Sequence, residues 1–147
     1  DPFFSAANPR AMNFGSMGMV MGHEISHGFD DSGRRFSATG VLEEWWEPEV
    51  AARFEERAEC IVEQYEAYEP LEGKPLNGRL TLGENIADNG GMKQSYRAYM
   101  KWIADNGREP EIAGFTNEQL FFIGSAQSWC SLVTDELQEQ YLVTDPH

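Results

Sequence analysis

The residues with the clearest chemical potential form an HExxH motif at positions 23–27. A helix turns by about 100° per residue, so His23 and His27 would share one helix face and could bind one ion. Neutral imidazole is a common zinc ligand. Glu24 follows the first histidine and can reach a water molecule at the metal without binding the metal, as a general base must. Chance alone would produce this motif in well under ~1% of chains of this length, so it predicts zinc.

A third zinc ligand is needed, because catalytic zinc sites usually have three protein ligands and one open position. The segment TLGENIAD, residues 81–88, supplies Glu84 and Asp88 one helical turn apart. One of them can bind the metal while the other accepts a hydrogen bond from a ligand histidine. The alternative is an ordinary solvated acidic face, the default in a chain with 25 carboxylates.

Asp30 lies three residues after His27. If the helix continues, its carboxylate can reach back to an imidazole N–H and orient that ring. Otherwise it marks a helix end or a turn, and the local sequence favours neither interpretation.

Helices must carry these residues, and the sequence predicts a mainly α fold. Helical patterns cover residues 11–29, 43–68 and 82–105, and a capping box at Thr116 and Gln119 opens another helix through Trp129. Residues 30–40 and 69–80 predict loops from their composition. Residues 1–10 predict an extended, partly buried lead-in, and no segment alternates as a strand.

The composition excludes several classes of protein. With 25 acidic and 11 basic side chains, the net charge of −14 argues against binding nucleic acid. No apolar run approaches the roughly 18 residues of a membrane span, so we expect no membrane contact by this segment. Cys60 and Cys130 form no CxxC pair. From the residues alone they could bridge each other, stay reduced in a core, or pair with cysteines outside this chain.

Two segments resemble the neprilysin and endothelin-converting-enzyme family of zinc metallopeptidases: GHEISHGFDDSGRRF, residues 22–36, and LNGRLTLGENIADNGG, residues 76–91. The similarity runs through nearly all 147 residues, including FFSA, the Trp45-Trp46 pair, YRAY and QLFF. HExxH together with ENIADNGG is highly specific. The resemblance implies a thermolysin-like zincin catalytic-domain fragment, with an HExxH helix and a second, Glu-bearing helix.

The resemblance also implies a role for each residue of the metal site. His23, His27 and Glu84 are the ligands of one Zn²⁺ per chain, and Glu24 is the base that activates water. The implied activity is zinc-dependent endopeptidase cleavage of oligopeptides. The alternative is a catalytically inactive, zinc-stabilised helical binding module. The intact Glu24 argues against it, since a structural zinc site needs no base.

Further residues act around that site in the family. The resemblance implies that Asp30 and Asp88 orient the two histidines, and that His147 stabilises the oxyanion of the tetrahedral intermediate. It also implies a pocket for the residue after the scissile bond. Four residues match positions that line this pocket, although from the residues alone they are equally well explained as core: Phe3, Met19, Val20 and Trp129.

The departures from the family pattern are mostly absences. Family members are several times longer, with an N-terminal lobe over the cleft, a peptide-binding strand upstream of Asp1 and an arginine shortly after the position of His147. We therefore expect residues 1–147 to be the zinc-bearing part of a single catalytic domain, truncated at both ends. Its expected partners are peptide substrates and the missing remainder of the enzyme, and the isolated chain is expected to be nearly inactive.

The cysteines and the cell compartment follow from the same resemblance. Cys60 and Cys130 match cysteines that, in animal members, bridge to partners outside this stretch. The catalytic part of those members lies outside the cell. We therefore expect an extracellular or cell-surface ectodomain, with a soluble bacterial form as the alternative.

Overall fold

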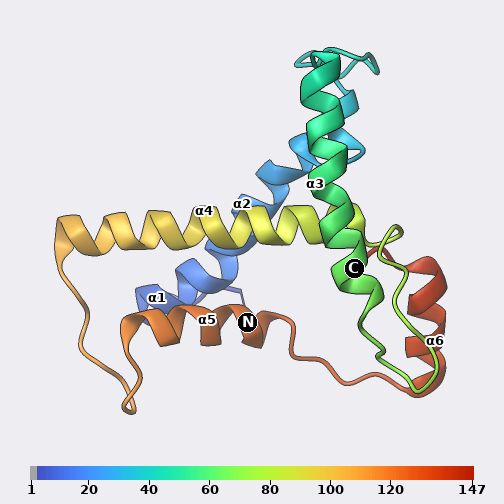
Figure 1. Cartoon of the computed structure of the whole chain (residues 1–147). Helices are drawn as coiled ribbons and strands as arrows, with labels where there is room; N and C mark the ends of the chain where they lie inside the picture. The colour runs from blue at the N-terminus through green and yellow to red at the C-terminus, as the bar shows by residue number, and fades with distance from the viewer. Residues whose placement is uncertain (1–2) are drawn as a thin grey trace. The chain divides into compact units, whose positions relative to one another are not determined.

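The computed structural model describes residues 3–147 and is mainly helical (Figure 1). In chain order the helical elements are α1 (Arg10–Asn13), a π-helical segment (Phe14–Gly18), α2 (Met19–Ser26), two 3₁₀ turns (His27–Phe29 and Gly33–Arg35), α3 (Pro48–Glu66), α4 (Leu82–Asn106), α5 (Asn117–Ser128) and α6 (Asp135–Thr144). Within residues 3–147 no strand forms, and only isolated β-bridges occur. The predicted mainly α fold is confirmed.

The chain divides into two compact units, each built from two separate stretches of sequence. Unit 1 comprises residues 1–25 and 88–131, and unit 2 comprises residues 26–87 and 132–147. Both α2 and α4 therefore contribute residues to each unit. The assignment of residues 1–147 to one catalytic domain stays a prediction.

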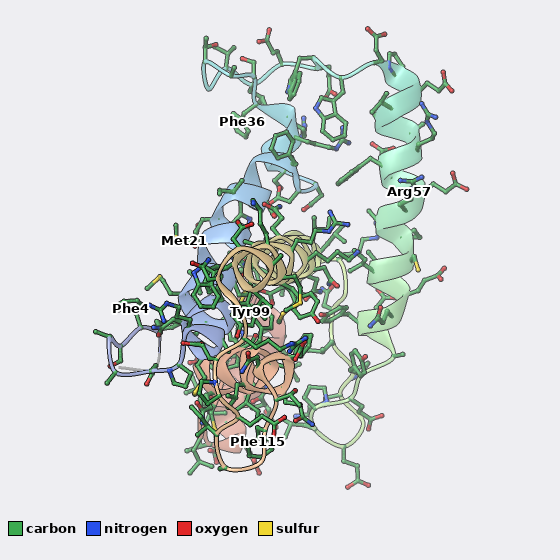
Figure 2. All side chains as sticks on the ribbon, turned by 90° about the vertical axis from the view of Figure 1, so that its left-hand side faces the viewer. Phe4, Met21, Phe36, Arg57, Tyr99 and Phe115 are labelled. Atoms are coloured by element: carbon green, nitrogen blue, oxygen red, sulfur yellow. The ribbon has the colours of Figure 1, made fainter. Side chains whose placement is uncertain are left out.

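The core of unit 1 is aromatic. Tyr99 and Phe121 are fully buried and stack with ring centroids 6.1 Å apart, and Phe14 lies 5.3 Å from the Tyr99 ring. In Figure 2 the Tyr99 side chain lies among the helices, whereas Phe4 and Met21 lie on the outside of the ribbon. Burial raises the pKa of Tyr99 to about 12, because the charged phenolate is poorly solvated there.

The first predicted helix, residues 11–29, is helical over its whole length, but it is not a single α-helix. Residues 10–29 are helical, yet Phe14–Gly18 form a π-helical segment between α1 and α2. Gly15 explains why this turn packs so closely, since a Cβ there would lie 1.9 Å from the Phe121 carbonyl oxygen. The Ser95 hydroxyl, from α4, also donates to the Phe14 carbonyl. Such π segments arise where side chains enter the backbone hydrogen-bond ladder.

Unit 2 has a smaller core. Ala58 and Val62 of α3 and Leu82 of α4 are buried, and Phe54, Ile61 and Ile86 pack against them. α3 begins at Pro48, not at residue 43 as predicted. Proline disfavours helical backbone angles in the residue before it, and Glu47 is accordingly extended, with ψ of 136°.

The later helices confirm two predictions and add one element. α4 runs from Leu82 to Asn106 without interruption, and the Thr116–Gln119 capping box opens α5. α6 was not predicted. Its N-terminus is capped by Thr134, whose side chain accepts the Leu137 N–H at 3.3 Å. Within residues 3–147, no helix is both long and apolar enough to cross a membrane.

The lead-in is partly buried, and both cysteines are exposed. Asp1 and Pro2 of the lead-in lie outside the described residues. Phe3 and Phe4 are 41% and 53% exposed, whereas Ser5, Asn8 and Pro9 are half-buried, so residues 3–10 are partly buried as predicted. Cys60 and Cys130 are both free and exposed. This excludes a mutual bridge and a buried reduced pair, and leaves open a pairing with cysteines outside this chain.

Candidate metal centre

His23 is held in unit 1 by a carboxylate on α4. The imidazole is 7% exposed, and its Nδ1 lies 2.8 Å from Oδ1 of Asp88. In the tautomer that this contact favours, Nδ1–H donates to Asp88 and the lone pair is on Nε2. A ligand histidine typically has this arrangement, because the carboxylate fixes the ring orientation and raises the basicity of the metal-binding nitrogen.

A close approach of two glycines brings these residues together. A Cβ on Gly22 would lie 2.8 Å from the Cα of Gly91. A Cβ on Gly91 would lie 2.5 Å from both the His23 backbone nitrogen and the Met19 carbonyl oxygen. The backbones of α2 and α4 are therefore in direct contact here, one turn of α4 beyond Asp88.

We expect Gly91→Ala to weaken both the fold and the His23–Asp88 contact. The added methyl meets backbone atoms, which cannot rotate away, and overpacking typically costs ~1–3 kcal/mol. The gain in helix propensity, up to ~1 kcal/mol, offsets only part of this. The variant should lose about 1–2 kcal/mol in free energy of unfolding, measured by urea denaturation, and should bind zinc more weakly. Gly28→Ala is the control, since nothing lies within 4 Å of its Cβ position; equal losses in both variants would contradict the argument.

Glu24 differs from His23 in its surroundings, although the two are adjacent on α2. Its side chain is exposed, whereas His23 is buried. An exposed carboxylate beside a buried imidazole can exchange a proton with a water molecule while the imidazole holds an ion.

In unit 2, Asp30 holds the second histidine of the motif. Nδ1 of His27 lies 2.7 Å from Oδ2 of Asp30, which is 5% exposed. The other Asp30 oxygen accepts the backbone N–H groups of Ser32 and Gly33, at 2.9 and 2.6 Å. Gly33 is required for this turn, because a Cβ there would lie 1.8 Å from the His27 carbonyl oxygen. The Asp30 side chain therefore contacts His27 and also closes a turn, so both arrangements that the sequence allowed occur together, and its role at a metal stays a prediction.

Glu84, in the first turn of α4, meets two imidazoles in unit 2. Its Oε2 lies 3.3 Å from Nε2 of His27 and 3.2 Å from Nε2 of His147. Charge-assisted hydrogen bonds between nitrogen and carboxylate are shorter, about 2.7–2.9 Å. Atoms that share a tetrahedral zinc at ~2.0–2.1 Å lie about 3.3–3.4 Å apart. The spacing between Glu84 and His27 therefore fits two ligands of one zinc ion, and His147 lies next to this pair.

The structure distributes the predicted residues over two groups. Unit 1 brings together His23 and Asp88, with Glu24 next to them in the chain. Unit 2 brings together His27, Asp30, Glu84 and His147. The chain passes between the two units at three places: within the HExxH motif, within α4 between Glu84 and Asp88, and after Ser131.

The four predicted pocket residues differ widely in exposure. Met19 is 1% exposed and belongs to the core of unit 1, and Val20 is half-buried. Phe3 and Trp129 are 41% and 52% exposed. The interpretation of all four as core residues is therefore wrong for Phe3 and Trp129, and the pocket itself stays a prediction.

The sequence patterns did not identify the residues that allow close backbone contacts beside the site residues. These are the glycines at close backbone contacts: Gly22, Gly33 and Gly91. The only available signal for them was their position inside or beside the two motifs. Asp31 was also not assigned a role. Burial and the neighbouring Asp30 carboxylate raise its pKa.

Comparison with known proteins agrees with this arrangement. The chain is 51% identical to endothelin-converting enzyme 1 of Cavia porcellus, over 99% of this chain and 20% of that protein. It is also 51% identical to neprilysin-1 of Caenorhabditis elegans, again over 99% of this chain and 20% of the relative. The chain therefore spans about a fifth of the length of these relatives.

Solved structures show the same fold. The structure of Mycobacterium tuberculosis zinc metalloprotease ZMP1 in complex with an inhibitor superposes with a TM-score of 0.93 at 37% identity, covering 99% of this chain and 23% of that one. The sequence profile of peptidase family M13 matches residues 1–147 in full. The predicted resemblance is confirmed: the chain belongs to peptidase family M13.

Proposed function

We propose that this chain is the zinc-bearing part of an endopeptidase that hydrolyses peptide bonds in oligopeptides. The observation that carries the proposal is the position of the Glu84 carboxylate, whose Oε2 lies 3.3 Å from Nε2 of His27 in unit 2. This spacing suits shared coordination of zinc better than a direct hydrogen bond. Membership of peptidase family M13, in which the M. tuberculosis relative is named a zinc metalloprotease, supports the same chemistry.

We assign one zinc ion per chain to His23, His27 and Glu84. The HExxH spacing supports the two histidines, and their Nδ1 contacts with Asp88 and Asp30 favour the tautomer that binds a metal through Nε2. When bound, zinc would polarise the peptide carbonyl and lower the pKa of a water molecule toward ~7.

The side chains of this chain would then divide the proton transfers. Glu24 accepts the proton of the attacking water and returns it to the leaving amine. His147 donates an N–H to the developing oxyanion, where a fixed donor stabilises the transition state. Its 3.2 Å contact with Glu84 supports a place beside the metal. Asp30 and Asp88 act indirectly, because each keeps one ligand imidazole in a single orientation.

Substrate selection is assigned to the four residues implied by the family. Exposed Phe3 and Trp129 offer aromatic surface, and Met19 and Val20 lie in and beside the core of unit 1. We propose that they form a pocket for a large apolar side chain after the scissile bond. The partners are accordingly peptides and the remainder of the longer protein, in an extracellular or cell-surface setting.

Metal removal tests the proposed function. We expect the full-length protein to cleave a quenched fluorescent oligopeptide, to lose almost all activity after dialysis against a chelator, and to recover it with one equivalent of Zn²⁺. Circular dichroism before and after dialysis controls for unfolding. Unchanged cleavage by metal-free, folded protein would contradict metal catalysis. Tight binding of one zinc without any cleavage would instead support the inactive binding module.

A further inference from the structure

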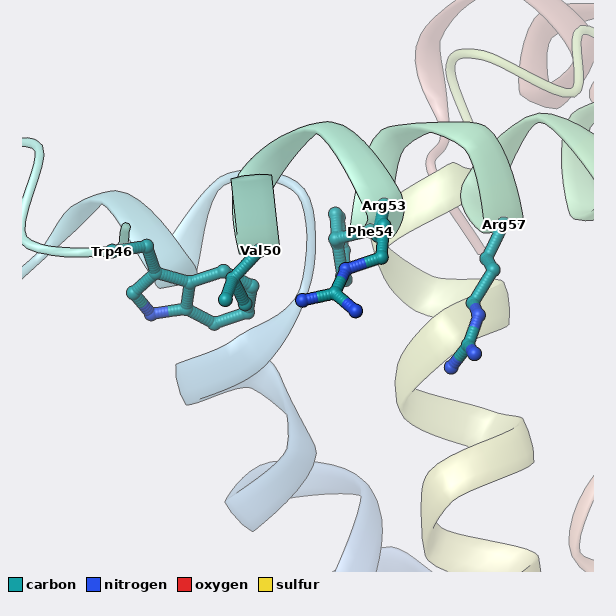
Figure 3. Close-up of a pocket in the computed structure, with 5 residues that line it drawn as sticks. All are labelled: Trp46, Val50, Arg53, Phe54 and Arg57. Carbon is teal, nitrogen blue, oxygen red and sulfur yellow. The ribbon is translucent and has the colours of Figure 1, made fainter. Parts of the chain in front are cut away.

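A second candidate site lies in unit 2, on a face of α3 and the segment before it (Figure 3). It is an open pocket of about 310 Å³, and none of its residues belongs to the candidate metal centre. This volume is at the lower end of the range for small-molecule sites, and suits a ligand the size of one amino-acid residue. The pocket is lined by Trp46, Val50, Arg53, Phe54 and Arg57.

One side of the pocket is apolar, and its two aromatic rings contact the guanidinium of Arg34. Trp46 and Phe54 meet edge to face, with ring centroids 5.5 Å apart. The guanidinium of the buried Arg34 lies 5.6 Å from the Trp46 ring centroid and 5.2 Å from that of Phe54. Arg34 is itself fixed by Glu55, at 2.7 Å. Cation–π contacts with an immobilised arginine stabilise both rings, so the apolar wall is preformed.

The other side of the pocket carries two arginines one helical turn apart. Figure 3 shows the Arg53 and Arg57 side chains extending from the same side of α3, with Arg53 reaching toward Val50. The only carboxylate near Arg53 among residues 3–147 is Glu49, at 3.7 Å, and both side chains are largely exposed. Arg57 has no ion-pair partner among the same residues.

We propose that this pocket binds an apolar carboxylate of the size of an N-acylated amino acid. Guanidinium groups bind carboxylates through paired, charge-assisted hydrogen bonds, which Arg53 and Arg57 would donate. The apolar part of the ligand would contact Trp46, Val50 and Phe54. A purely apolar ligand would leave both cations unused, and a simple inorganic anion would leave the aromatic wall uncovered.

Calorimetric titration of the full-length protein carrying Glu24→Gln, which prevents turnover, tests the proposal. The probes are N-acetylphenylalanine, its uncharged amide, acetate and inorganic phosphate. We expect N-acetylphenylalanine to bind at least tenfold more tightly than the other three. Arg53→Gln and Arg57→Gln should each weaken its binding roughly tenfold, the usual effect of losing a hydrogen bond to a charged group. Both arginines are exposed, so neither variant should unfold.

Arg97→Gln is the matched control. Arg97 is an exposed arginine of α4 in unit 1, and its loss changes the net charge equally. This variant should bind N-acetylphenylalanine with unchanged affinity. The proposal is overturned if the acid and the amide bind equally, if phosphate binds more tightly than the acid, or if the Arg53 and Arg57 variants match the control. Failure of peptide hydrolysis would not affect this result, because the readout is binding.

Discussion

Glu24→Gln is expected to abolish peptide hydrolysis while leaving zinc bound. The amide keeps the size of the side chain and cannot accept a proton from water, so general-base catalysis is lost. That contribution is typically ~10²–10⁴-fold, and the loss is larger if the same group also returns the proton to the amine. Glu24 is exposed and is not assigned as a ligand, so the ion should stay in place. Turnover of a fluorescent oligopeptide and zinc content per protein are the two measurements.

Glu56→Gln provides the control for this experiment. Glu56 is an exposed residue of α3 that lines neither the candidate metal centre nor the pocket on this helix, and the substitution removes the same charge. Its turnover should equal that of the unmodified protein. Appreciable hydrolysis by the Glu24 variant would refute the base assignment, and loss of its zinc would identify Glu24 as a residue that supports the site.

Glu84→Gln and Asp88→Asn are expected to differ strongly in zinc affinity, although the two carboxylates are one turn apart on α4. If Glu84 is a ligand, the substitution replaces an anionic oxygen with a neutral one and should remove most zinc binding. Asp88 contacts His23 at 2.8 Å and acts through that imidazole. Losing such a partner typically costs about 10–100-fold in affinity or activity. Because the asparagine oxygen still accepts a hydrogen bond, Asp88→Asn should lower the zinc affinity by a factor near the lower end of this range.

Zinc dissociation constants, measured by competition with a chromogenic chelator in the full-length protein, distinguish these roles. If the Asp88 variant loses more zinc affinity than the Glu84 variant, then Asp88 is the ligand and Glu84 is the residue that orients a histidine. Affinity like that of the unmodified protein in both variants would mean that the third ligand lies elsewhere. A spectrum of the Co²⁺-substituted protein adds a readout that overall destabilisation would not mimic, since the spectrum reports the ligand set directly.

Part of the fold and of the candidate site was predictable from the sequence, because it depends on local rules. Helical periodicity predicted α4, and the capping box at Thr116 predicted the start of α5. The HExxH spacing and the Glu84–Asp88 spacing determine which side chains can share a helix face. Residue types then favour a transition metal over calcium or magnesium, which take oxygen ligands, and the HExxH motif predicts zinc. Proline also acts locally: Pro48 keeps Glu47 out of helical backbone angles, so α3 begins later than the periodicity predicts.

Other features depend on contacts between segments far apart in the sequence. α6 has few apolar residues, and its Tyr141 and Leu142 line a small cavity together with Leu76 of the connector. The π-helical segment depends on the approach of α5 to Gly15 and of α4 to Phe14.

The sequence by itself predicted zinc, its candidate ligands and the helices that carry them. Only the tertiary structure decided which carboxylate holds which histidine: Asp88 for His23 and Asp30 for His27. The first pairing requires α2 and α4 to touch at Gly22 and Gly91, and a glycine in a sequence does not say which backbone it will meet. Spacing along a helix sets only the direction of a side chain, whereas a hydrogen bond of 2.7–2.8 Å requires the partner's position as well.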